Sequence, residues 1–314
     1  MTVDLLINLE MPQYSRDYLA ESYTIHYWPD PREHPRLLRD PIAKKIRAVQ
    51  TNGSFGIKRE FIEAMPALEI ICAIGAGFEG IDVIAARERG IVVTNGAGAN
   101  AAAVAEQAWA LLLATVRRVP WCDRAVREGR WKEARTVLPS VTGKKLGIFG
   151  LGHVGIEMAK RGALGFGMEV GYCSRTPRTD ASYLYFDRLH DLAAWCDVLM
   201  IAAPGGPETR HAVNGAVLRA LGPEGFLINV ARGSLVDSGA LIEALREKYI
   251  AGAGLDVIEG EPAVPPEFLE LDRLVMSPHV GGQSPEALRS MIHKVRANLD
   301  AHFAGQPVLS PIPV

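Results

Sequence analysis

The sequence lacks the features that direct a protein to nucleic acid or into a membrane. Its 34 lysines and arginines are balanced by 36 aspartates and glutamates, so no basic field is available for nucleic acid or anionic lipid. The longest membrane-like stretch, Ala101–Val116, contains Glu106 and Gln107 and falls short of the ~20 apolar residues that span a bilayer. We therefore expect no nucleic-acid partner and no membrane anchor, and we predict a buried helix over this stretch.

Cysteine is scarce, which argues against a disulfide framework and a metal site. The four cysteines are far apart, form no C-x-x-C pair and have no histidine nearby at zinc spacing: Cys72, Cys122, Cys173 and Cys196. We expect free, buried or half-buried thiols and no bound metal. Residues 1–8 also lack the basic start and the small-residue cleavage site of a signal peptide. Together these features predict a cytoplasmic protein.

Short β-branched runs alternate with helix-length segments along the whole chain. Its 314 residues and 48% hydrophobic content suffice for two packed cores. Such alternation predicts the α/β class, with two doubly wound parallel-sheet domains of the Rossmann-like or flavodoxin-like kind. We predict strands at 3–9, 23–28, 46–51, 69–74 and 91–94 in the first domain, and at 145–149, 169–173, 198–203, 226–230, 251–257 and 274–276 in the second.

Two further segments frame these series of strands. Residues 100–119 are alanine-rich and helical by propensity, and the charged residues 121–141 end at a Thr142-Gly143 break. We interpret them as the connector between the two series. Near the end of the chain, Ser284 and Pro285 have the pattern of an N-cap followed by proline at the first helical position. They predict a helix that runs to about residue 304 and stops at Gly305.

A glycine-rich turn follows the first strand of the second series. The motif G-x-G-x-x-G occupies residues 150–155, between an apolar strand and a helical segment at 153–164. In this arrangement Gly150 makes the tight turn, Gly152 lets the backbone approach a pyrophosphate, and Gly155 lets the helix pack on the strand. The helix N-terminus then attracts the anion. A purely structural glycine turn is the alternative, but the flanking strand and helix favour dinucleotide binding.

The end of the next strand indicates which dinucleotide binds. An NAD enzyme usually places an aspartate or glutamate there, to bind the adenosine ribose. Here the strand runs into Ser174, Arg175, Thr176, Pro177 and Arg178, without an acid. Two hydroxyls and two guanidiniums suit a 2′-phosphate, and Arg175 can stack on adenine. A solvated basic turn is the alternative; we predict NADP(H) as the preferred cofactor, with NAD(H) possible.

Three strands of the second series are followed by polar side chains of catalytic types. Arg232, Glu261 and His279 come after the strands that begin at residues 226, 251 and 274. The carboxyl ends of parallel strands share one edge, where open α/β sheets hold ligands, so we expect the three side chains to lie together. Taken singly, each also suits an ordinary role: a surface ion pair, a loop carboxylate and a packed histidine.

This set suits the reduction of a keto acid, which needs a hydride at carbon and a proton at oxygen. Arg232 can pair with the substrate carboxylate or polarise the carbonyl, and His279 can supply the proton. A carboxylate at Glu261 fixes the imidazole tautomer and favours the protonated ring. The backbone amides of Ala76 and Gly77, on a glycine turn after the strand at 69–74, can bind the substrate carboxylate. No metal is needed.

Six ordered motifs resemble those of the D-isomer-specific 2-hydroxyacid dehydrogenase family, over essentially the whole chain. They occupy residues 75–82, 104–106, 150–155, 229–233, 255–257 with 261–262, and 277–282. The resemblance implies that Arg232 holds the substrate, that His279 is the acid/base and that Glu261 orients it. It implies that Asp256 meets the nicotinamide carboxamide. It implies further cofactor contacts from Leu151, His153, Val154, Ala203, Pro204, Thr209, Val230, Ala231, His279 and Gly281.

The resemblance also implies how the domains are arranged. Residues 1–97 with 285–314 would form a substrate-binding domain, interrupted by a dinucleotide-binding domain at 98–284, with a closing cleft between them. Members are commonly homodimers joined through the cofactor domain, and residues 100–141 resemble the helix and arm that join them. Trp131 is a candidate to reach the partner's active site; a core or interface tryptophan is the alternative.

The turn at 174–177 looks like that of the glyoxylate/hydroxypyruvate reductase branch. We therefore predict NADP(H)-dependent reduction of a small 2-keto acid to the D-2-hydroxy acid. A dinucleotide-sensing, corepressor-like binding protein is an alternative with the same fold, but such proteins carry long tails that this sequence does not show. A dehydrogenase of another small anion, such as phosphite, stays open. Loops such as 51–55 select the substrate side chain, so the sequence names neither the keto acid nor the physiological direction.

Overall fold

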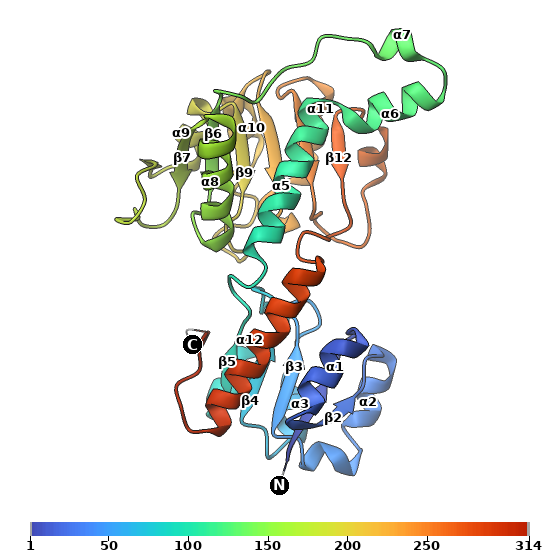
Figure 1. Ribbon diagram of the computed structural model, residues 1–314, viewed down its shortest axis with the longest axis vertical. Coiled ribbons are helices and arrows are strands. Elements are labelled where there is room, and N and C mark those ends of the chain that lie inside the picture. Colours follow the sequence, from blue (N-terminus) through green and yellow to red (C-terminus); the bar gives the residue numbers. More distant parts are fainter. Residues whose placement is uncertain (1, 313–314) are drawn as a thin grey trace. The chain divides into compact units, whose positions relative to one another are not determined.

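The computed structural model describes residues 2–312, which divide into two compact units (Figure 1). Unit 1 comprises residues 1–100 and 284–314, and unit 2 comprises residues 101–283. The assignment of substrate binding to residues 1–97 with 285–314, and of dinucleotide binding to residues 98–284, stays a prediction.

Unit 1 is built on a five-stranded, all-parallel sheet. Its strands are β1 (Val3–Ile7), β2 (Tyr23–Tyr27), β3 (Ala48–Thr51), β4 (Ile70–Ala73) and β5 (Val92–Thr94). They lie in the order β2-β1-β3-β4-β5, which is the flavodoxin-like order. Successive residues of β1 alternate between the two faces: Leu5 and Ile7 enter one core and Leu6 enters the other. Both faces are therefore apolar and must be covered.

Helices cover both faces of this sheet. The helical segments of unit 1 are α1 (Gln13–Ala20), η1 (Pro31–Glu33), α2 (His34–Leu37), η2 (Pro41–Lys44), α3 (Arg59–Ala64), α4 (Val83–Glu88) and α12 (Pro285–Phe303). The long α12 returns to unit 1 and packs against β4 and α1. Its start is as predicted, because Ser284 Oγ accepts the Ala287 amide at 3.0 Å and Pro285 is the first helical residue. Its end is also confirmed, with Gly305 at a φ of 70°.

Unit 2 is built on a seven-stranded, all-parallel sheet. Its strands are β6 (Lys145–Phe149), β7 (Glu169–Cys173), β8 (Leu184–Phe186), β9 (Val198–Ile201), β10 (Phe226–Asn229), β11 (Gly252–Leu255) and β12 (Leu274–Met276). The strands lie in the order β12-β11-β10-β9-β6-β7-β8. Strands β7 and β8 extend the sheet on one side of β6, and β9 to β12 extend it on the other side, as in dinucleotide-binding folds. The short edge strand β8 was not predicted. It has three residues, none fully buried, so its sequence carries little hydrophobic signal.

The helices of unit 2 also form two layers. One face carries α5 (Ala101–Val116) and α8 (His153–Phe166), and the other carries α9 (Leu189–Trp195), α10 (Gly215–Leu221) and α11 (Ser238–Arg246). The predicted helix at 100–119 is interrupted, because Arg118 adopts a φ of 49° between α5 and α6 (Val119–Arg127). The segment with α6 and α7 (Trp131–Ala134) projects from the rest of the unit (Figure 1). Two short 3-10 helices, η3 (Gly233–Leu235) and η4 (Pro266–Glu270), complete the unit.

The predicted α/β class with two doubly wound parallel sheets is confirmed. The four cysteines are free, as expected, and three of them are buried. Burial raises the pKa of Cys72 to about 12 and that of Cys196 to about 12, so neither is a reactive thiolate at neutral pH. In the described part of the chain, no helix combines the length and the apolar character needed to cross a membrane.

Candidate active site

The glycines of the 150–155 turn fit their predicted mechanical roles. Gly150 has a φ of 96°, and a Cβ built there would lie 2.5 Å from the Ala203 nitrogen. A Cβ on Gly155 would lie 2.2 Å from the Gly150 carbonyl oxygen, so α8 packs directly on the turn. No atom lies within 4 Å of a Cβ built on Gly152, the N-cap of α8. The backbone at the start of α8 is therefore open to an approaching anion.

A cavity of about 660 Å³ lies beside this turn and is large enough for much of a dinucleotide. Nine of the predicted cofactor residues line it: Gly150, Leu151, Gly152, Ser174, Arg175, Thr176, Ala203, Pro204 and Thr209. The others do not line it: His153, Val154, Gly155, Val230, Ala231, Asp256, His279 and Gly281. Glu208 also lines the cavity, although it was not predicted as a cofactor residue.

The turn after β7 presents its two guanidiniums differently. Arg178 Nε donates to Asp180 Oδ1 at 2.8 Å, and Nη1 donates to the Leu151 carbonyl at 3.0 Å. The Asp180 pKa is lowered by this hydrogen bond from Arg178. Arg175 makes no side-chain hydrogen bond or ion pair with any residue from 2 to 312. Arg175 is therefore the cation available to a ligand, whereas Arg178 braces the turn.

Arg232 lies on a turn that a buried asparagine shapes. Asn229, at the end of β10, is fully buried. Its Nδ2 donates to the Arg232 carbonyl at 2.9 Å, and its Oδ1 accepts the Ala231 amide at 3.0 Å. The Arg232 Nη1 donates to the Ala231 carbonyl at 2.7 Å. The Asn229 side chain thus holds the backbone at Ala231 and at Arg232. This role of Asn229 was not predicted from the sequence.

The next glycine brings the Arg232 turn against the segment that carries Glu261. A Cβ on Gly233 would lie 2.1 Å from the Ile258 carbonyl carbon and 2.3 Å from the Glu259 nitrogen. Only glycine permits this approach of two backbones. Glu261 is oriented within its own loop, because its Oε2 accepts the Ile258 amide at 3.1 Å.

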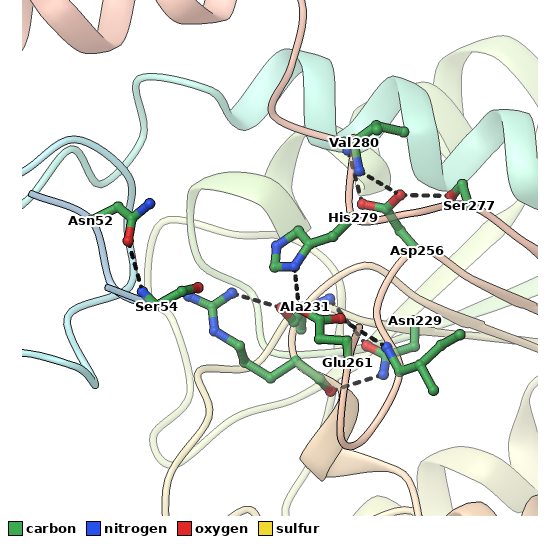
Figure 2. A network of polar contacts seen from close by, with 12 residues as sticks. Asn52, Ser54, Asn229, Ala231, Asp256, Glu261, Ser277, His279 and Val280 are labelled. Carbon is green, nitrogen blue, oxygen red and sulfur yellow. Dashed lines mark hydrogen bonds and ion pairs between the residues drawn. The ribbon is translucent and has the colours of Figure 1, made fainter. Parts of the chain in front are cut away.

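His279 and Glu261 form a close pair, as predicted. His279 Nδ1 lies 2.5 Å from Glu261 Oε1, and the two side chains are 42% and 39% exposed (Figure 2). A carboxylate at Nδ1 leaves Nε2 as the ring nitrogen available to a ligand. The pair is thus accessible, and its contact fixes which ring nitrogen can exchange a proton with a bound molecule.

Asp256 holds the turn on which His279 lies. Its carboxylate is buried and accepts hydrogen bonds from Ser277 Oγ at 2.6 Å and the Val280 amide at 3.0 Å (Figure 2). It also accepts the Gly281 amide at 2.8 Å. Gln107 Nε2, on α5, donates to Ser277 Oγ at 2.8 Å. His279 has a φ of 55°, a left-handed conformation that costs a non-glycine residue stability and needs such support.

A second ionic contact ties the cofactor side of unit 2 to the Glu261 loop. His211 Nε2 lies 2.9 Å from Glu259 Oε1, and Arg210 pairs with the same oxygen at 2.8 Å. The His211 amide donates to the Ser234 carbonyl at 2.8 Å. The loop that carries Thr209 is therefore braced against the loops after β10 and β11.

In unit 1, the predicted anion-binding amides lie on a loop that packs against another glycine loop. A Cβ on Gly53 would lie 2.5 Å from the Gly77 carbonyl carbon. Asn52 Oδ1 accepts the Ser54 amide at 3.0 Å and so closes the turn that contains Gly53 (Figure 2). Asn95 Nδ2 donates to the Ala76 carbonyl at 2.8 Å, which leaves the amides of Ala76 and Gly77 outside this contact.

Comparison with known proteins decides the family. The family profile "D-isomer specific 2-hydroxyacid dehydrogenase, NAD binding domain" matches residues 109–281. A hydroxyphenylpyruvate reductase of Plectranthus scutellarioides is 38% identical over 312 residues, which are 99% of each chain. The chain belongs to the D-isomer-specific 2-hydroxyacid dehydrogenase family.

Other members show the branch. A glyoxylate/hydroxypyruvate reductase A of Arabidopsis thaliana is 39% identical over 313 residues, 99% of each chain. An NADPH-dependent glyoxylate/hydroxypyruvate reductase of Sinorhizobium meliloti, solved with NADP and malonate, matches with a TM-score of 0.89 and 36% identity, over 99% of this chain and 97% of that one. The predicted resemblance to the glyoxylate/hydroxypyruvate reductase branch of the dehydrogenase family is confirmed.

Several residues around this dehydrogenase site were not predicted as part of it. Asn229 and Ser277 lie inside the recognised motifs, so their positions were known but their hydrogen bonds were not. Gln107 is far away in sequence, on a helix that was predicted as a buried connector and as part of a dimer contact, not as part of this site. No pattern in the sequence predicts that contact, because it depends on how α5 packs on the sheet.

Proposed function

We propose that this dehydrogenase uses NADP(H) to reduce a small 2-keto acid, of the glyoxylate/hydroxypyruvate kind, to the D-2-hydroxy acid. The observation that carries the proposal is the accessible His279–Glu261 pair, held by Asp256 on the same unit as the Arg232 turn. The names of the relatives support the reaction class, because they include reductases of glyoxylate, hydroxypyruvate and hydroxyphenylpyruvate.

The residues of unit 2 fit a bound dinucleotide. The backbone at Gly152 and the start of α8 would hold the pyrophosphate, and the cavity beside them would hold the adenosine half. Arg175 would bind a 2′-phosphate, assisted by the hydroxyl of Thr176. When bound, the reduced cofactor supplies a hydride to C2 of the keto acid.

The chain's own side chains supply the rest of the chemistry. Arg232 pairs with the substrate carboxylate and polarises the carbonyl, and the amides of Ala76 and Gly77 bind the same anion from unit 1. The protonated His279 donates from Nε2 to the carbonyl oxygen as negative charge develops there. Glu261 orients the ring through its contact with Nδ1, so that Nε2 faces the bound acid. In the oxidative direction, the neutral ring accepts the hydroxyl proton.

The test measures oxidation of NADPH at fixed enzyme concentration with glyoxylate, hydroxypyruvate, pyruvate, a branched keto acid and an aromatic keto acid. A second assay measures reduction of NADP+ by phosphite. Turnover of at least one keto acid is the expected result, with the D enantiomer wherever the 2-hydroxy acid formed is chiral. Dinucleotide binding without turnover of any of them would favour the binding-protein alternative instead. Turnover of phosphite alone would favour a dehydrogenase of that anion.

The same proposal includes a homodimer joined through the segment at 100–141. This segment exposes apolar side chains that a monomer would leave in water, namely Val119, Val126, Trp131 and Val137, the last fully exposed. A hollow of about 600 Å³ between this segment and β12 offers further unfilled surface, with Leu269 exposed at its rim. A second copy of the chain would cover these side chains.

A further inference from the structure

Unit 1 contains a cavity of its own, of about 200 Å³, at the end of β1. Its walls come from three stretches of the sequence, at 6–8, 31–37 and 55–61. Three rings line it, those of His34, Phe55 and Phe61. Seven other residues complete the lining: Leu6, Asn8, Pro31, Leu37, Gly56, Ile57 and Lys58.

The rings form an edge-to-face cluster centred on His34. The centroid of the His34 ring lies 6.2 Å from that of the Phe55 ring and 6.1 Å from that of the Phe61 ring, at steep interplanar angles. His34 Nε2 also lies 3.0 Å from the Trp28 carbonyl, which holds its orientation. Such walls suit a flat, apolar ligand group, because aromatic rings pair favourably in edge-to-face and offset geometries.

One polar group in the wall lacks a hydrogen-bond partner. Asn8 is 6% exposed, and its Nδ2 donates to the Gly56 carbonyl at 2.9 Å. Its Oδ1 is buried and has no partner within residues 2–312. A buried acceptor left unpaired is costly, so a ligand that brings a hydroxyl or amino donor would be favoured here.

The loop that lines the cavity is the one that packs on the predicted anion-binding loop. Gly53 packs against Gly77, and a Cβ on Gly56 would lie 2.0 Å from the Gly80 carbonyl oxygen. The Gly80 amide donates to the Gly53 carbonyl at 2.7 Å. Two residues lie between Gly53 and Gly56, so their Cα atoms are three steps and at most about 11 Å apart. The cavity is therefore within one small-molecule length of the amides at Ala76 and Gly77.

We infer that this cavity binds the aromatic side chain of a 2-keto acid, with a ring hydroxyl donating to Asn8 Oδ1. The inference rests on the proposed function, in which the substrate carboxylate binds at Ala76 and Gly77. The size agrees, because an apolar cavity of roughly 150 Å³ accommodates a benzene ring. Lys58, an exposed residue, contributes a cationic side chain to the lining of this cavity.

The experiment compares kcat/KM for glyoxylate, phenylpyruvate and 4-hydroxyphenylpyruvate in wild type and in two cavity-filling variants. His34→Trp and Leu37→Phe each add ring volume to the cavity, and two variants guard against one that fails to fold. Thermal unfolding checks that each variant is folded. The matched control is His190→Trp, which makes the same change at an exposed histidine of unit 2.

Apart from its carboxylate, glyoxylate carries only hydrogen at the carbonyl carbon, so it has no side chain to place in the cavity. Both filling variants should retain glyoxylate turnover and lose at least about tenfold in kcat/KM for the aromatic acids, while His190→Trp should change neither. Glyoxylate turnover with no aromatic turnover, or with aromatic turnover that filling leaves unchanged, would overturn the inference alone. Failure on every keto acid would instead overturn the proposed function.

The ring hydroxyl is tested with the wild-type enzyme. A neutral hydrogen bond to Asn8 should give 4-hydroxyphenylpyruvate an advantage of about threefold to tenfold in kcat/KM over phenylpyruvate. Equal values for the two acids would overturn the role given to Asn8.

Discussion

The carboxylate of Asp256 accepts the backbone amide of Gly281 at 2.8 Å, and a Cβ on Gly281 would lie 2.9 Å from the same oxygen. The Asp256 carbonyl also accepts the His279 amide at 2.8 Å. One residue after β11 thus holds the turn that carries the histidine. The family resemblance implies a nicotinamide contact for Asp256; its hydrogen bonds within the protein give it a positioning role as well.

Asp256→Asn should disturb this turn. The amide would place a donor opposite one of the donors that the carboxylate now accepts, so a stability loss of about 1.5–3 kcal/mol is expected. Turnover should fall with it, because His279 depends on the same hydrogen bonds. Chemical denaturation and NADPH oxidation measure the two effects. Gln107→Ala removes only the outer donor to Ser277 and should cost less of both; an equal or larger loss would contradict this order.

Arg175→Ala should weaken NADPH binding selectively. A charge-assisted contact to the 2′-phosphate contributes roughly 1.5–3 kcal/mol, so Kd for NADPH should rise by about tenfold or more while Kd for NADH changes little. Fluorescence titration with both cofactors measures this. Arg178→Ala is the matched control, because its guanidinium pairs with Asp180 and Leu151 and its loss should affect both cofactors alike. An equal loss of both cofactors in Arg175→Ala would remove the basis for NADP preference.

Arg232→Lys should fold and bind NADPH but lose most of its activity. An ammonium cannot reproduce the planar, two-donor geometry of a guanidinium towards a carboxylate. We expect kcat/KM to fall by about tenfold or more, mostly through a weaker keto-acid interaction. Steady-state kinetics and an NADPH titration separate the two steps. Turnover close to wild type would contradict the assignment of Arg232.

The two directions of the reaction should depend on pH with opposite sign. Keto-acid reduction needs protonated His279 and should fall as the ring loses its proton, while oxidation of the hydroxy acid should rise over the same interval. In Glu261→Gln the ring loses the carboxylate that fixes its tautomer and orientation, so kcat should fall in both directions. pH–rate profiles of both directions provide the measurement. A kcat close to wild type in Glu261→Gln would mean that the pair is not coupled during catalysis.

Val137→Asp should convert a dimer into a monomer. The side chain is fully exposed in the single chain, and a charge there would have to be desolvated in an interface. Light scattering coupled to size-exclusion chromatography measures the mass. Leu164→Asp, at a residue of α8 that is 87% exposed, makes the same kind of change outside the 100–141 segment and should leave the mass unchanged. A monomeric wild type, or a dimer that survives Val137→Asp, would contradict this interface.

Much of the fold follows from local sequence. The alternation of buried runs and helix-length segments predicted eleven of the strands that the structure shows, usually one or two residues too long at the ends, because apolar residues continue past the last ladder hydrogen bond. Chain-local chemistry also predicted the start of α12 at Ser284 and Pro285. The edge strand β8 and the break at Arg118 were not predicted, since neither depends on a strong hydrophobic pattern.

The sequence by itself also determined which side chains could do the chemistry, because glycine turns, an arginine after one strand and a histidine after another are local patterns. Only the tertiary structure decided how they are held. The geometry of the predicted Glu261–His279 pair and the contact of Gln107 with Ser277 depend on the packing of separate strands and helices. The hydrogen bonds of Asn229 to the Arg232 turn are local in sequence, but the residue types alone did not predict them. The same is true of the two arginines after β7: their residue type is identical, and the neighbouring Asp180 and the Leu151 carbonyl engage Arg178 and leave Arg175 to a ligand.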